Sequence, residues 1–173
     1  VYEKLDSLLD NDEWKDKIIF TYIGNLPKKF NFKNTIHLNP LSGQKLAKEI
    51  KKNHLYITGS LNEPSGNHHI EGSQCGLPTM YIDSGGVKEY CNNFGIEYTI
   101  KNLENKLLDV IENYENYSDR ISNYPFSSDL MSEDYLLLFR EMLNNQESIL
   151  LSRHLGKGTY LGEKIFKIKR SFN

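Results

Sequence analysis

The stretch that decides the fold runs from Leu55 to Ile82 and reads LYITGSLNEPSGNHHIEGSQCGLPTMYI. It opens with apolar, aromatic and β-branched residues at 55–58, which predict a buried strand. A helix is expected over 67–75, where Gly76 and Pro78 then stop it, and a second strand follows over 79–82. Strand, helix and strand in this order form a βαβ unit with two parallel strands.

The alternation of strands and helices continues on both sides of this unit. Further strands are expected at residues 17–23, 35–38 and 97–100. Helices are expected from residue 42, from 85 to about 90, over 103–111 and over 132–143. Ser132 is the expected N-cap of the last helix, and the polar segments 25–34 and 116–129 are interpreted as linkers. We therefore predict an α/β fold with a Rossmann-like parallel sheet flanked by helices.

The composition is that of an ordinary globular protein. Of 173 residues, 38% are hydrophobic and 25% are charged, and no apolar run approaches the ~20 residues that span a bilayer. The formal net charge of -2 argues against broad nucleic-acid binding, which needs a concentrated basic surface. We expect a cytoplasmic protein with one domain over 1–145 and a C-terminal helix or tail over 146–173.

Two smaller features bear on redox state and surface contacts. Cys75 and Cys91 are the two cysteines, and we interpret both as buried, inert thiols in a reducing compartment. A basic stretch near the end is interpreted as a solvated tail. The alternative is contact with anionic lipid, as a peripheral membrane partner, or with another domain. Its residues are Lys164, Lys167, Lys169 and Arg170.

The segment between the strand at 55–58 and the next helix occupies the position where ligands bind. In open parallel sheets, ligands bind at the carboxyl ends of the strands, where helix N-termini point. Gly66 lets a ligand approach the backbone, and the free N–H groups of residues 67–70 favour an anion such as a diphosphate. Glu63 on the loop and Glu71 in the helix can then face one crevice.

These residues form a pattern with a family resemblance. The chain reads Ser60-x-x-Glu63-x-x-Gly66-x-x-x-x-Glu71-x-x-x-x-Gly76-x-Pro78, and then Gly85-Gly86-x-x-Glu89. The pattern resembles the E-x7-E region of the family 4 retaining glycosyltransferases of GT-B architecture. The resemblance covers roughly residues 17–100. It implies that the chain is the C-terminal, donor-binding half of such an enzyme, which transfers a sugar to a glycan or other acceptor with retention of anomeric configuration.

The resemblance also implies roles for particular residues. Glu63 would be the catalytic residue, orienting the donor sugar and stabilising positive charge near the anomeric carbon, and Glu71 would bind the ribose hydroxyls. The remaining donor-binding residues implied are Gly66, Asn67, His68, Gly85, Gly86 and Leu41, the last at the base. No cofactor and no bound metal are implied. His68 and His69 lie about 100° apart on a helix and make a poor metal-binding pair.

One part of the family pattern is missing. The family places a first strand, with an Arg and a Lys for the diphosphate, before the helix that Leu5, Leu8 and Leu9 match. We therefore expect this chain to begin inside the domain, with those cations and the acceptor-binding N-terminal domain lying upstream. About five parallel strands are then expected, with none within residues 1–16. The 173 residues alone are expected to be inactive.

Three other interpretations stay open. A nucleotide-sugar epimerase or phosphorylase shares the two-domain plan, but needs further acid–base groups or a pyridoxal-phosphate lysine that we cannot identify. A non-catalytic binding or assembly module would keep the fold alone. In the simplest case, Glu63 caps a turn and Glu71 is a surface residue. A dinucleotide oxidoreductase is disfavoured, because no G-x-G-x-x-G follows a strand.

Overall fold

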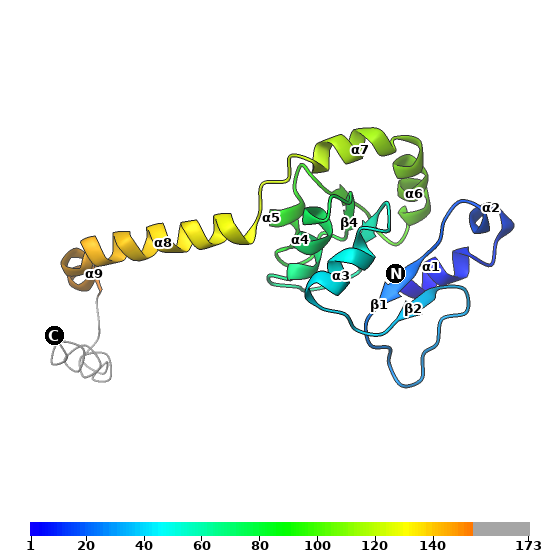
Figure 1. Ribbon diagram of the computed structural model, residues 1–173, viewed down its shortest axis with the longest axis horizontal. Helices are drawn as coiled ribbons and strands as arrows, with labels where there is room; N and C mark the ends of the chain where they lie inside the picture. Colours follow the sequence, from blue (N-terminus) through cyan, green and yellow to red (C-terminus); the bar gives the residue numbers. More distant parts are fainter. Residues whose placement is uncertain (154–173) are drawn as a thin grey trace. The chain divides into compact units, whose positions relative to one another are not determined.

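The computed structural model describes residues 1–153 of the chain. It divides into two compact units, Val1–Ser127 and Ser128–Asn173. The basic stretch predicted as a tail, from Lys164 to Arg170, lies outside the described residues. The elements of the first unit alternate between helices and short strands (Figure 1). They are α1 (Tyr2–Leu8), α2 (Asp12–Lys15), β1 (Thr21–Ile23), β2 (Ile36–Leu38), α3 (Gly43–Ile50), β3 (Tyr56–Ile57), α4 (Asn67–Gln74), β4 (Thr79–Tyr81), α5 (Val87–Cys91), β5 (Ile96–Glu97), α6 (Leu103–Glu112) and α7 (Tyr114–Ile121).

The strands form two small parallel sheets. β1 pairs with β2, with Thr21 opposite Ile36. The second sheet has the order β3-β4-β5, with Tyr56 opposite Thr79 and Met80 opposite Ile96. Within the described residues the prediction of five strands is confirmed, and residues 1–16 contain none. The expected single sheet is divided, because no hydrogen-bonded pairing joins β1 to β3.

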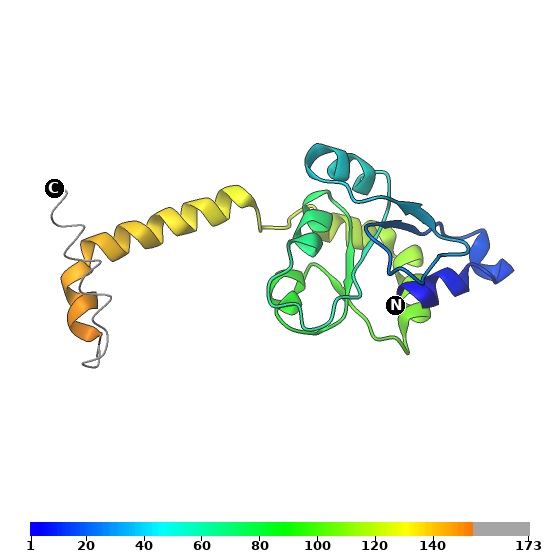
Figure 2. The ribbon, with the colours of Figure 1, turned by 90° about the horizontal axis from the view of Figure 1, so that it is seen from below.

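Helices cover both faces of the three-stranded sheet. Neighbouring residues of a strand point to opposite faces, and in β4 Met80 and Tyr81 belong to different core clusters. Tyr81 packs with Val87 and Cys91 of α5. Figure 2 shows the first unit from a second direction. The main core joins α1, α2 and α6 to β4 and β5 through Leu5, Trp14, Met80, Ile96, Tyr98, Leu103, Leu107 and Val110. The fold is therefore α/β, with small parallel sheets flanked by helices.

Three sequence-based predictions are wrong in detail. Ser132 is no N-cap: α8 begins at Ser128, and the Ser132 hydroxyl donates to the Ser128 carbonyl oxygen inside the helix. The segment 116–129 is not all linker, because α7 covers most of its first part. Tyr117 anchors α7 by donating from its hydroxyl to the carboxylate of Asp109 in α6, 2.7 Å away. Cys91 is buried as expected, but Cys75 is only half-buried.

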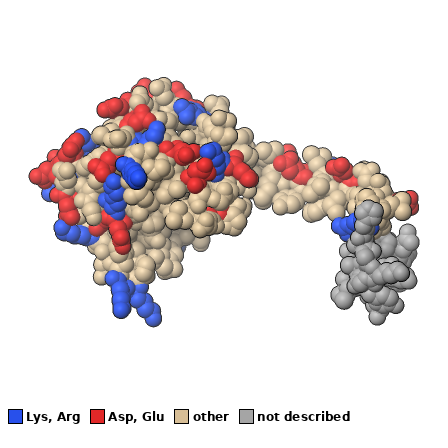
Figure 3. Space-filling view, turned by 180° about the vertical axis from the view of Figure 1, so that it is seen from behind, with Lys and Arg blue, Asp and Glu red and all other residues tan. Residues whose placement is uncertain are grey.

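The second unit consists of α8 (Ser128–Asn144) and α9 (Gln146–Ser152) as far as it is described. Neither helix contains a buried residue. The surface of α8 is mostly uncharged, whereas acidic and basic side chains are interspersed on the first unit in this view (Figure 3). Among residues 1–153, we find no helix with the length and apolarity that crossing a membrane requires.

Candidate functional site

The glutamate loop, residues 58–66, connects the end of β3 to α4 and packs against the loop that follows β4. The backbone N–H of Gly86 donates to the carbonyl oxygen of Glu63 at 2.8 Å. The N–H of Asn62 donates to the hydroxyl of Ser84, also at 2.8 Å. Since β3 and β4 are parallel neighbours, both loops leave the same carboxyl edge of the sheet. The sequence-predicted residues on the two loops are therefore brought together.

Glycines allow this close approach. Gly85 has a φ of +67°, and a Cβ there would collide with the carbonyl oxygen of Glu63. A Cβ on Gly86 would collide with the carbonyl oxygen of Pro64. At Gly66, an added Cβ would lie 2.7 Å from both Cγ of Glu63 and Cε1 of His68. Each of these predicted glycines thus borders the glutamate loop at a position where a larger residue does not fit.

His68 is a side chain whose pKa both predicted glutamates influence. Its Nε2 lies 2.8 Å from the hydroxyl oxygen of Thr58 and 3.3 Å from that of Ser60. Burial lowers the pKa of His68, and the carboxylates of Glu63 and Glu71 oppose that shift. The net pKa stays below its usual value, so the ring is neutral at pH 7. Both carboxylates therefore lie within electrostatic reach of one imidazole.

The two glutamates differ in exposure but share their freedom from ion pairs. Glu63 is half-buried and Glu71 is exposed. In the part of the chain that the structure describes, neither forms a salt bridge with a lysine or arginine. Lys88, in the first turn of α5, is instead bound to Asp83 at 2.9 Å and Glu97 at 3.2 Å. Both carboxylates thus remain available to a ligand, and no described cation is committed to them.

His69 is a buried neighbour that the sequence did not distinguish from His68. Its side chain is 0% exposed, and neither ring nitrogen has a hydrogen-bond partner within residues 1–153. The ring lies 5.1 Å from that of His68 and 5.4 Å from that of Tyr90, measured between centroids. Burial, reinforced by His68, lowers the pKa of His69 to about 4. The buried ring is therefore neutral at pH 7.

The start of α4 offers backbone donors at this edge. Gly66 is the N-cap and supplies no side-chain hydrogen bond, and Asn67, the first helical residue, is exposed. The first N–H groups of a helix have no partner inside it, and they carry the positive end of the helix dipole. Gly72 fits the helix closely onto β3, since a Cβ there would lie 2.5 Å from the Tyr56 ring. The amides at this end of α4 therefore suit an anion.

Leu41 is the predicted residue that the described contacts do not join to this group. It is half-buried and lies after β2, which belongs to the other sheet, directly before the N-cap of α3. Its assignment to the base of a nucleotide stays a prediction. As for metals, residues 1–153 contain no cluster of three or more His, Cys, Asp or Glu side chains that could hold an ion.

Sequence reasoning missed the hydroxyl groups that hold the loop. Thr58 and Ser60 contact His68, and the hydroxyl of Tyr98 donates to the carbonyl oxygen of Thr58 at 2.8 Å. The hydroxyl of Tyr2 accepts from the N–H of Gly59. The available signal was the pair of hydroxyl residues directly after an apolar strand. Tyr2 and Tyr98 carry no such local signal, because they reach the loop from distant parts of the chain.

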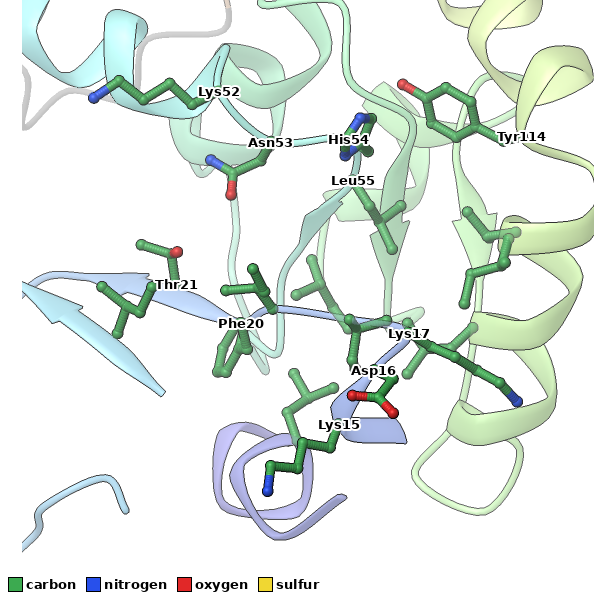
Figure 4. Close-up of a pocket in the computed structure, with 18 of the residues that line it drawn as sticks. Lys15, Asp16, Lys17, Phe20, Thr21, Lys52, Asn53, His54, Leu55 and Tyr114 are labelled. Atoms are coloured by element: carbon green, nitrogen blue, oxygen red, sulfur yellow. The ribbon is translucent and has the colours of Figure 1, made fainter. Parts of the chain in front are cut away.

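A large cavity lies elsewhere in the first unit. Its volume is about 1010 Å³, and residues of β1 and β3 line it, whereas neither Glu63 nor Glu71 does (Figure 4). The candidate site is therefore an open edge of the sheet, defined by hydrogen-bonded loops and carboxylates. Among known proteins, no family model matches this chain. We also found no curated protein with significant sequence similarity to it.

Proposed function

We propose that this chain is the donor-binding half of a retaining glycosyltransferase of GT-B architecture, built on a Rossmann-like sheet. A nucleotide sugar binds at the carboxyl edge of β3. The observation that carries the proposal is that the loop bearing Glu63 packs against Gly85 and Gly86 at the carboxyl edge of the sheet, directly before the uncapped start of α4, the helix that contains Glu71. Two free carboxylates and a row of free amide donors are together suited to a ligand that carries both hydroxyl groups and phosphates.

Each part of the site meets a different part of the ligand. The first amides of α4 bind a diphosphate oxygen, and Glu71 accepts hydrogen bonds from two ribose hydroxyls. Glu63, on the tightly held loop, lies by the sugar and stabilises positive charge that develops at the anomeric carbon. The bond from that carbon to the diphosphate breaks as the acceptor oxygen bonds to the carbon. The nucleoside diphosphate leaves, and the acceptor proton passes to it.

Charge balance limits what the described residues do alone. A diphosphate beside two carboxylates is repelled unless cations compensate, and Lys88 is already paired with Asp83 and Glu97. The described part of the chain places no other lysine or arginine in an ion pair at the glutamate loop. We therefore expect weak donor binding and no turnover from the 173 residues, with the phosphate-binding cations and the acceptor site supplied by the complete protein.

A panel of nucleotide sugars and nucleoside diphosphates tests the proposal. In a thermal-shift or calorimetric titration of the complete protein, a donor raises the melting temperature according to its affinity. We expect Glu71→Gln to weaken binding of the bare nucleoside diphosphate about 10-fold or more, since it replaces charge-assisted hydrogen bonds. Glu63→Gln should leave that affinity within about 2-fold, and should lower sugar transfer.

Glu112→Gln is the matched control, because Glu112 is an exposed glutamate at the end of α6. It should change neither binding nor transfer. The proposal fails if no nucleotide sugar or diphosphate stabilises the complete protein. It also fails if the protein transfers sugar and neither Glu63→Gln nor Glu71→Gln differs from the Glu112→Gln control.

A further inference from the structure

The hydroxyl group of Thr58 is enclosed where β3 ends. Thr58 is 2% exposed, and its hydroxyl oxygen accepts a hydrogen bond from the backbone N–H of Ser60 at 3.3 Å. The same oxygen lies 2.8 Å from Nε2 of His68, and within residues 1–153 it has no other hydrogen-bond partner. A buried hydroxyl proton without an acceptor costs free energy, so the Thr58 hydroxyl donates to Nε2 of His68.

This hydrogen bond decides which nitrogen of His68 carries the proton. A neutral imidazole has one N–H and one bare nitrogen, and the nitrogen that accepts is the bare one. Burial lowers the pKa of His68 more than the two glutamates raise it, so the ring is neutral at pH 7. Because Nε2 accepts from Thr58, the proton lies on Nδ1. The hydroxyl of Ser60, 3.3 Å from Nε2, can donate to the same nitrogen and favours the same tautomer.

Nδ1 of His68 and the side chain of Glu63 flank one point beside Gly66. A Cβ built on Gly66 would lie 2.8 Å from Nδ1 of His68 and 2.7 Å from Cγ of Glu63. Within residues 1–153, neither Nδ1 nor the Glu63 carboxylate forms a hydrogen bond. Both side chains are half-buried, and Nδ1 is not enclosed as the ring nitrogens of His69 are. A free donor and a free acceptor therefore lie side by side where a ligand can reach them.

A donor beside an acceptor distinguishes a hydroxyl group from a phosphate. A sugar hydroxyl can accept from Nδ1–H and donate to a carboxylate at the same time. An ionised phosphate oxygen has no proton to donate, and the carboxylate repels it. The pair formed by His68 and Glu63 therefore suits a hydroxyl group, whereas the amides at the start of α4 suit the diphosphate.

We propose that Thr58 is a positioning residue, which fixes His68 as the Nδ1–H tautomer so that His68 and Glu63 together bind one hydroxyl group of the donor sugar. His68 donates to the hydroxyl oxygen, and that hydroxyl donates to the carboxylate of Glu63. Without the Thr58 hydroxyl, the proton can move to Nε2, and Nδ1 then offers a lone pair that cannot serve the sugar oxygen. The inference rests on the proposed function, since it places a nucleotide sugar at the glutamate loop.

The tautomer is measured first, in the complete protein without ligand. With isotope-labelled histidine, nitrogen NMR shifts distinguish a protonated ring nitrogen from a bare one, and His68→Phe assigns the His68 signals by their loss. We expect Nδ1 to be protonated and Nε2 to be bare at pH 7. A proton on Nε2 of the unaltered protein would overturn the proposal.

Substitutions of threonine then test what sets the tautomer. Thr58→Val keeps the shape but removes the hydroxyl, and it should move part of the proton to Nε2, while Thr58→Ser should restore the original shifts. The matched control is Thr79→Val, which removes another buried threonine hydroxyl, one that bonds to Ser73, and should leave the His68 signals unchanged. Unchanged His68 shifts in Thr58→Val would mean that Thr58 does not fix the ring, and the proposal would be wrong.

Binding separates this inference from the proposed function. In calorimetry of the complete protein, UDP-glucose, UDP-N-acetylglucosamine and GDP-mannose are compared with UDP and GDP. Thr58→Val should weaken binding of the nucleotide sugar about 5-fold or more and that of its nucleoside diphosphate by less than about 2-fold, and Thr58→Ser should recover the loss. If the diphosphate binds but Thr58→Val weakens both ligands equally, or neither, this inference fails and the proposed function stands. If no ligand binds, the proposed function fails and this inference fails with it.

Discussion

The two sheets of the first unit have the same parallel pairing but are held in different ways. In β4 of the three-stranded sheet, Thr79, Met80 and Tyr81 are all buried, with exposed fractions of 0%, 0% and 4%. No residue of β1 or β2 is buried. A two-stranded pair is marginal in water by itself. The three-stranded sheet is therefore stabilised by apolar packing, and the two-stranded sheet of β1 and β2 must depend on contacts made by its connections.

A buried carboxylate supplies the polar part of those contacts. Asp6 of α1 is buried and accepts hydrogen bonds from the backbone N–H groups of Lys33, Asn34 and Thr35, all at 2.8–2.9 Å. It also accepts one from the hydroxyl of Thr35 at 2.6 Å. These bonds fix the chain directly before β2 to α1. The comparison teaches that a strand pair lacking a buried face can be positioned by a neighbouring helix, here through the Asp6 carboxylate and the Tyr2 ring, which packs on Tyr22.

The largest expected effect contrasts core substitutions in the two sheets. Met80→Ala removes a fully buried side chain and should lower the free energy of unfolding by about 2–5 kcal/mol. Ile36→Ala, at 50% exposure, should cost less than about 1 kcal/mol. Urea denaturation followed by circular dichroism measures both. Similar losses for the two variants would remove the distinction between the sheets.

The next effect is the pH dependence of stability that His69, in helix α4, is expected to cause. Since the pKa of His69 is about 4 in the folded chain and about 6.5 when unfolded, the unfolded state binds more protons between these values. Stability should therefore fall as the pH drops from about 6.5 to about 4. His69→Phe should reduce that loss by about 3 kcal/mol at pH 4, measured as unfolding free energy against pH. The exposed His54→Asn is the control, and an unchanged pH profile for His69→Phe would contradict the expectation.

The smallest effect tests the polar anchor of the other sheet. Burial opposes ionisation of Asp6, but the hydrogen bonds from Thr35, Lys33 and Asn34 outweigh it and hold its pKa below the usual range. Its contribution is therefore present above a pH of about 4 and is lost as the pH falls through the lowered pKa. Asp6→Ala should cost about 1–3 kcal/mol at pH 7.

The pH profile completes that test. The difference between Asp6→Ala and the unaltered chain should shrink below a pH of about 4, and the exposed Asp134→Ala should show no difference at either pH. Thermal unfolding at pH 7 and pH 3 gives the comparison. A constant difference would mean that Asp6 acts through packing and not through its charge.

Local signals account for what the sequence predicted about the fold. Apolar residues with Gly76 and Pro78 as breakers placed β3, α4 and β4 within one or two residues of their observed bounds. The division into two sheets had no such signal, because it depends on pairing between strands that are distant in the sequence. The start of α8 was misplaced because a serine is typical of a cap, while Leu130 and Met131 before it continue the helix.

The candidate site likewise contains residues that the sequence predicted from their order along the chain and residues that only packing between distant elements brings together. The order of Glu63, Gly66, His68, Gly85 and Gly86 after strands predicted their meeting, since loops after neighbouring parallel strands share an edge. The burial of His69 and the hydroxyl contacts of Tyr2 and Tyr98 were not predictable, because they arise only when separate elements pack. The Asp6 anchor was missed for the same reason: its partner Lys33 is 27 residues away.

The close approach at the glycines also has a consequence for tracing this protein's ancestry. At Gly72, Gly85 and Gly86, an added Cβ would strike the Tyr56 ring or the backbone of Glu63 and Pro64, so the packing of α4 on β3 and of the two loops on each other requires glycine at these positions. Gly76 has a φ of +86° but open space around it, so asparagine could replace it. A search template weighted on those three glycines and on Glu63 would recognise diverged relatives that overall similarity does not reveal.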